Sequence, residues 1–128
     1  MNAEEARAGL QMVVNYLNEN DPNLVVEDYD PWETQAQIAL REHPSLAFEV
    51  LDSEQSDSTL IVLSEAMREA CGYHSTEYRQ WIETLKSSES RRHQKFGKSE
   101  GRLANFFRGL EKLSERLDAK VSFGRKFP

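Results

Sequence analysis

The side chains whose type and spacing could do chemistry are cations near the end of the 128-residue chain. Six polar positions recur every three or four residues, which places them on one side of a helix: Lys98, Arg102, Asn105, Gly109, Lys112 and Arg116. Lys and Arg on such a face can neutralise phosphates, and Asn or Arg can hydrogen-bond base edges in a groove. The spacing therefore predicts an anion-binding face, although a helix side that is simply solvated would show the same spacing.

Further cations flank this series and make the end of the chain basic. Residues 91–128 hold eleven Lys or Arg against four acids, a net charge of +7, whereas residues 1–90 hold five against eighteen, a net charge of −13. This split indicates an anion-binding surface carried on an acidic body. We predict nucleic-acid contacts at the following residues: Arg91, Arg92, Lys95, Lys98, Arg102, Asn105, Lys112, Arg116, Arg125 and Lys126.

The element that must position these cations is a helix that we expect to begin at Ser99 as its N-cap. Its apolar residues share one side at about 100° per residue, and we expect that side to be buried: Leu103, Phe106, Phe107, Leu110, Leu113 and Leu117. Residues 119–123 alternate polar and apolar side chains, which predicts a short strand. Gly124, Arg125 and Lys126 then form a basic turn. Helix, strand and basic turn follow the order of a winged helix, whose wing cations would contact phosphates.

Apolar periodicity predicts five earlier helices, over residues 2–20, 31–41, 46–51, 59–71 and 75–87. Residues 24–29 could be a short strand or an extended loop, and residues 87–98 show no apolar periodicity, which predicts a basic loop. The polar stretch 52–58 is the expected boundary between an acidic helical region, 1–57, and a winged-helix-like basic module, 58–128. A single compact domain is the alternative. The predicted fold class is mainly α, with a helical N-terminal part and a C-terminal module that carries a short β-element.

Two short runs in this module resemble a known family. Leu103-Ala-Asn-Phe-Phe-Arg-Gly-Leu110 followed by Val121-Ser-Phe-Gly-Arg125 resembles the C-terminal module of phage and plasmid primase–helicase proteins, in which a helix rich in Leu and Arg precedes a strand ending in an aromatic residue, Gly and Arg. The match covers about 25 residues, and Asp118-Ala119-Lys120 stands where the family has a Gly. The resemblance implies a DNA-binding winged helix and no catalysis.

Catalytic, metal-binding and cofactor-binding patterns are weak in this chain. Gly97-Lys98-Ser99 lacks the upstream Gly of a phosphate-binding loop, because position 92 is Arg. The three His have no metal-ligand spacing with each other or with Cys71, the single cysteine. The acidic segment 27–33 lacks the Gly of a calcium loop, so we expect a surface loop without metal. We therefore predict no enzyme activity, no metal and no cofactor.

The sequence favours a non-enzymatic nucleic-acid-binding protein, either a regulator or a replication or mobile-element accessory factor, with duplex DNA as the favoured partner. A second hypothesis is an acidic inhibitor or DNA mimic that binds a protein through its N-terminal region. A third is a helical subunit of a larger nucleoprotein complex. The single cysteine and the absence of a membrane-spanning or signal-peptide segment predict a cytoplasmic protein. The oligomeric state stays open.

Overall fold

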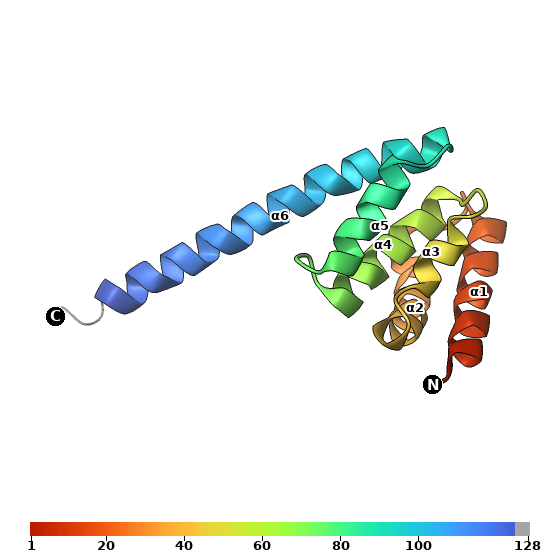
Figure 1. Cartoon of the computed structure of the whole chain (residues 1–128), viewed down its shortest axis with the longest axis horizontal. Helices are drawn as coiled ribbons and strands as arrows, with labels where there is room; N and C mark the ends of the chain where they lie inside the picture. Colours follow the sequence, from red (N-terminus) through yellow and green to blue (C-terminus); the bar gives the residue numbers. More distant parts are fainter. Residues whose placement is uncertain (125–128) are drawn as a thin grey trace.

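The computed structural model describes the backbone of residues 1–124 and the side chains of residues 1–118. The elements, in chain order, are α1 (Ala3–Asn20), the short 3₁₀ helix η1 (Val26–Asp28), α2 (Asp30–Glu42), α3 (Leu46–Val50), α4 (Asp57–Cys71), α5 (Thr76–Lys86) and α6 (Arg91–Gly124). Helices α1 to α5 form a body, and α6 starts on that body and extends far beyond it (Figure 1). The described residues contain no strand.

Local sequence explains where several helices begin and end. Asn2, Ser56 and Ser75 lie just before α1, α4 and α5, and the side chain of each accepts a hydrogen bond from a backbone N–H of the first turn. Helix α4 ends at Gly72, whose φ of 96° is a conformation that glycine adopts without strain. These stops fix the lengths of the helices that build the body.

The core lies between α1, α2, α4 and α5. Helix α4 is central, because it packs against α1, α2, α5 and α6. Trp81 and Tyr78 of α5 are fully buried, and the indole N–H of Trp81 donates to Ser64 Oγ at 2.9 Å. The aliphatic part of the core includes the following residues: Leu10, Val13, Leu17, Leu40, Leu60, Leu63, Met67 and Leu85.

The turn between α3 and α4 is tied to both ends of the chain. Gln55 is 3% exposed, and its side-chain carbonyl accepts from Asn18 of α1 at 2.9 Å. Its backbone N–H donates to His93 Nε2 of α6 at 3.0 Å. The polar stretch 52–58, predicted as a boundary, therefore makes specific hydrogen bonds to elements on each side of it.

The winged-helix prediction is wrong. Residues 119–123, predicted as a strand, continue α6, so the described chain lacks the β-element that a wing requires. The basic loop predicted over 87–98 is wrong from residue 91 onward, because α6 begins there. Ser90 rather than Ser99 caps this helix, since its Oγ accepts from the backbone N–H of His93 at 3.2 Å. The wing residues Arg125 and Lys126 lie outside the described residues.

Candidate nucleic-acid interface

The first part of α6 is held against α5 by small residues. An added Cβ at Gly97 would lie 2.8 Å from both Leu85 Cβ and the backbone nitrogen of Lys86, so only glycine permits this close approach. Ala104, two turns further along, is also buried. Gly97 belongs to the Gly-Lys-Ser run that resembles part of a phosphate loop, and its role here is helix packing.

A buried ion pair adds a polar anchor to this contact. Arg68 Nη1 of α4 lies 2.5 Å from Glu100 Oε1 of α6, with the two side chains only 14% and 7% exposed. The hydroxyl of Tyr78 donates to the same carboxylate oxygen at 2.6 Å, and burial together with this hydrogen bond raises the pKa of Tyr78 above its usual range. Glu100 therefore satisfies two buried groups from two helices and sets the rotation of α6 about its own axis.

That rotation leaves the apolar side of α6 in water. Ala104 and Glu100 face the body, and at about 100° per residue the apolar side points roughly 140° away. Its residues are between 37% and 60% exposed: Leu103, Phe106, Phe107, Leu110, Leu113 and Leu117. The prediction that this side is core is therefore wrong. Phe107 is the least exposed of these residues, and its ring centroid lies 5.6 Å from that of Tyr73 on the body.

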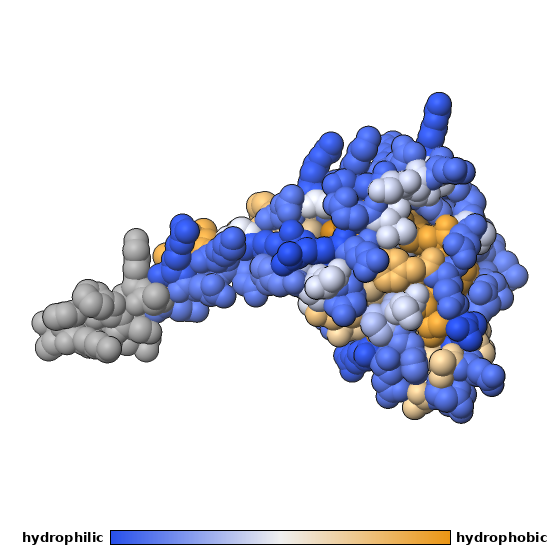
Figure 2. Space-filling view, viewed as in Figure 1, coloured by the Kyte–Doolittle hydropathy of each residue, from blue (hydrophilic) through white to orange (hydrophobic). Residues whose placement is uncertain are grey.

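The cations of α6 occupy a third side, between the body contact and the apolar side. The exposed predicted cations on this side are Arg91, Lys95, Lys98, Arg102, Lys112 and Arg116. Within residues 1–118 none of the six forms a salt bridge. From Lys98 to Arg116 the row extends about 27 Å along the axis. Figure 2 shows the projecting helix as largely hydrophilic, with hydrophobic atoms along its upper edge.

Two predicted contact residues have other partners. Arg92 turns toward the body, where its Nε lies 3.7 Å from Asp57 Oδ1. The side-chain carbonyl of Asn105 accepts a hydrogen bond from Arg108 Nη1 at 3.0 Å. The amide of Asn105 can still donate, so it is a less versatile base-edge reader than the sequence suggested.

The structure adds cations that the sequence analysis missed. A shallow groove between α5 and α6 is lined by Arg79, Lys86, Asn105 and Arg108, together with Glu83, whose Oε1 lies 3.2 Å from Lys86 Nζ. Arg108 also donates to the carbonyl of Tyr73 at 3.2 Å, which holds its guanidinium at the groove. Arg79 and Lys86 lie in the acidic half of the sequence, so only the packing of α5 on α6 could reveal that they extend the basic side.

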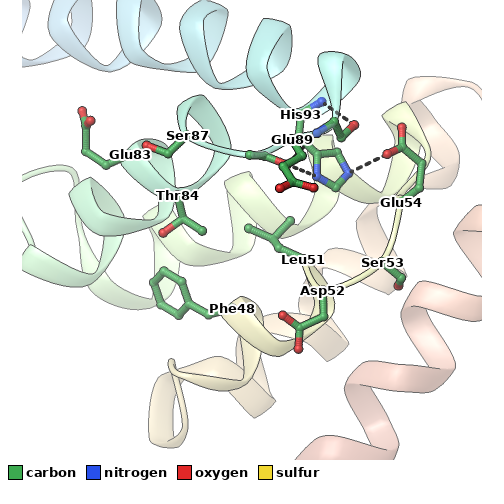
Figure 3. Close-up of a pocket in the computed structure, with 12 residues that line it drawn as sticks. Phe48, Leu51, Asp52, Ser53, Glu54, Glu83, Thr84, Ser87, Glu89 and His93 are labelled. Atoms are coloured by element: carbon green, nitrogen blue, oxygen red, sulfur yellow. Dashed lines mark hydrogen bonds and ion pairs between the residues drawn. The ribbon is translucent and has the colours of Figure 1, made fainter.

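A second hollow lies beside the C-terminal end of α5, where α3, the 52–54 turn and the start of α6 meet (Figure 3). His93 forms its inner wall and is 1% exposed. Its Nε2 accepts from Gln55 N–H, which leaves the proton on Nδ1, 3.4 Å from Ser88 Oγ. Burial lowers the pKa of His93 and favours this neutral form. Because both ring nitrogens are bonded within the protein, we assign His93 a structural role.

The acidic segment 27–33 makes local contacts on the body. In the segment 27–33, Asp28 Oδ2 accepts from the backbone N–H of Val25, and Trp32 stacks on Tyr16 with centroids 4.1 Å apart. The pKa of Glu33 is raised to about 7 by burial and by the neighbouring carboxylate of Glu65. Within the described residues, no group of three or more His, Cys, Asp or Glu is placed to hold a metal ion.

Comparisons with known proteins return no matching family model, curated protein or solved structure. The resemblance to primase–helicase modules therefore stays a prediction, without the winged helix that it implied. Over the described residues, none of the helices combines the length and apolar character needed to cross a bilayer.

Proposed function

We propose that this protein is a non-enzymatic nucleic-acid-binding protein that contacts the phosphate backbone with the basic side of α6. The observation that carries the proposal is the row of exposed cations on one side of a helix that extends beyond the body. Four of them, Lys98, Arg102, Lys112 and Arg116, recur at intervals of about one and three turns on the same side of α6. Each cation that meets a phosphate releases a counterion, which supplies affinity without sequence recognition.

Duplex DNA is the favoured ligand. An α-helix fits the major groove, and α6 extends past the 72–75 turn, which lies against it at Arg108 and Glu111. In that pose Arg102 and the free amide of Asn105 would face base edges. Lys98, Lys112 and the groove cations Arg79 and Lys86 would face phosphates. A regulator or accessory factor in a reducing cytoplasm fits this role and the single free Cys71.

The test is a salt titration of binding to a fluorescent duplex. With four to six phosphates neutralised, log Kobs should fall against log salt with a slope of about −4 to −5. The double variant Lys98→Ala/Lys112→Ala should reduce the magnitude of the slope by about 2. The matched control is Arg7→Ala/Arg41→Ala, which removes the same charge from exposed positions on α1 and α2, and its slope should equal that of wild type.

Two results would reject the proposal. The first is a wild-type protein that binds neither duplex nor single-stranded DNA at low salt. The second is a control that loses as much affinity and slope as the α6 variant, since net charge rather than the basic side would then govern binding. Asn105→Ala tests base reading separately, because loss of a base contact should weaken a preferred site by about 1–3 kcal/mol and leave random DNA unchanged.

A second function is favoured by a different observation, the exposed apolar side of α6. An amphipathic helix with an uncovered apolar side is a protein-binding element. The chain would then be a helical subunit of a larger assembly, with its basic side still available to nucleic acid.

A further inference from the structure

We propose that the apolar side of α6 is a pairing surface for α6 of a second copy of this chain, with the two helices parallel. The surface, here called the α6 seam, is defined by positions that alternate at intervals of three and four residues: Phe96, Ser99, Leu103, Phe106, Leu110, Leu113 and Leu117. This is the a/d spacing of a coiled coil over three heptads. The inference goes beyond the proposed function, because pairing requires no nucleic acid.

The α6 seam is open from Ser99 to Leu117. Leu103 to Leu117 are 42% to 60% exposed at the seam positions, and Ser99 is exposed as well. Phe96 is half-buried and lines a shallow pocket with Ile61 of α4, which is 37% exposed and extends the apolar surface onto the body. A solvent-facing apolar strip of this length is unusual on a monomer.

The body does not obstruct a second helix. The residues that bind α6 to α5, Gly97, Glu100 and Ala104, lie roughly 140° around the helix from the seam. Two chains related by a two-fold axis along the seam would therefore carry their bodies on opposite outer sides. Such an interface is self-complementary, as closed homodimers require.

Charges beside the seam select the parallel direction. With Leu103 and Leu110 at a positions, Arg102 and Arg116 occupy g positions, while Phe107 and Ser114 occupy e positions. In an antiparallel pair g faces g, so Arg102 of one chain would approach Arg116 of the other. In a parallel pair g faces e, so Arg102 meets Phe107 of the second copy, where a guanidinium can lie over a ring. Parallel pairing thus avoids like-charge contacts.

The area sets the expected strength. Six apolar residues are exposed at the seam or beside it: Leu103, Phe106, Phe107, Leu110, Leu113 and Leu117. Their exposed fractions together equal the surface of about three fully exposed Leu or Phe residues, which is on the order of 500 Å² per copy. Two copies would bury on the order of 1,000 Å², at the small end of specific interfaces. We therefore expect a reversible dimer that forms at high protein concentration rather than an obligate one.

Sedimentation equilibrium of the full chain, from about 1 to 300 μM and without nucleic acid, measures this pairing. Wild type should shift from monomer to dimer, and Leu110→Lys at the centre of the seam should stay monomeric over the whole range. Glu115→Lys is the matched control: it adds a lysine to the same helix on the side away from the seam and should dimerise like wild type. Circular dichroism should show both variants folded, because both side chains are exposed.

Disulfide trapping fixes the direction. In a parallel pair the two copies of residue 113 face each other, so Leu113→Cys should give a covalent dimer within minutes of mild oxidation, in a Cys71→Ser background. In an antiparallel pair those sulfurs would lie about 15 Å apart, and Leu103→Cys mixed with Leu113→Cys would cross-link instead. A monomer at 300 μM, dimers that survive Leu110→Lys, or preferential 103–113 cross-linking would each overturn the proposal. Capture of a different protein on the seam by a chain that remains monomeric would do the same.

Discussion

Substituting alanine at each of two glycines of α6 should change stability in opposite directions. An added methyl at Gly97 meets Leu85 Cβ and the backbone nitrogen of Lys86 at 2.8 Å, about a full ångström inside ordinary contact. Backbone atoms cannot move aside as a flexible side chain can, so α5 and α6 must separate. Overpacking of this kind costs about 1–3 kcal/mol, and loosening the surrounding contacts of Glu100 adds to it. The gain in helix propensity, about 1 kcal/mol, offsets only part of this cost.

Gly109 supplies the matched comparison. No atom lies within 4 Å of its added Cβ, so Gly109→Ala should gain most of the propensity term and stabilise the protein by about 0.5–1 kcal/mol. Gly101→Ala, whose Cβ would touch Ile82 Cγ2 at 3.5 Å, should also be tolerated. Gly97→Ala should destabilise by about 1–2 kcal/mol net.

Urea unfolding followed by circular dichroism, at protein concentrations of a few micromolar so that pairing does not contribute, measures all three changes. The unfolding midpoint should fall for Gly97→Ala and rise for Gly109→Ala at an unchanged m-value. A Gly97→Ala midpoint equal to or above that of wild type would refute the packing of α6 on α5. A fall for Gly109→Ala would show that the exposed part of α6 is covered in solution.

Three other predictions concern ionisable groups. Glu100→Ala leaves Arg68 charged and buried, so it should cost about 3–5 kcal/mol, whereas Glu111→Ala, which removes an exposed pair, should cost less than about 1 kcal/mol in the same urea assay. Because the pKa of Glu33 is raised to about 7, its contribution to stability is present below pH 4.5 and is lost as the pH rises through 7. Glu33→Gln should therefore raise the stability at pH 8 by about 1 kcal/mol, less than the shift alone implies because the site is partly solvated. No gain over wild type at pH 8 would count against the close approach of the Glu33 and Glu65 carboxyls. The pKa of His93 is lowered instead, so its contribution to stability is present above pH 6.5 and is lost as the pH falls. The melting temperature of wild type should therefore drop between pH 7 and 5, and the melting temperature of His93→Gln should depend less on pH. An equal dependence on pH in both proteins would contradict the structural role of His93.

Much of the helical body could be predicted from sequence because its signals are local. The stripes of α1, α4 and α5 place apolar residues every three or four positions, and polar caps and Gly72 mark several ends. Helices 2–20, 31–41, 46–51, 59–71 and 75–87 were each confirmed to within two residues. The prediction failed where the local pattern was compatible with both a strand and a helix. The alternation in 119–123 suits a short strand, yet a helix that is already formed extends through it at less cost than a new element would require.

Periodicity located the apolar and cationic sides of α6, whereas the small residues that meet the body, Gly97 and Ala104, were revealed only by the packing. What periodicity cannot state is which side meets the body, because an apolar stripe can be buried inside the chain or against another molecule. Here Gly97 and the pair between Glu100 and Arg68 decide the matter, since a close backbone approach and a satisfied buried charge occur in only one rotation of the helix. The sequence by itself thus determined the amphipathic helices and the basic character of the chain end. Only the tertiary structure turned the apolar side of α6 to solvent and brought Arg79 and Lys86 beside the basic side, because both depend on contacts between residues far apart in the chain.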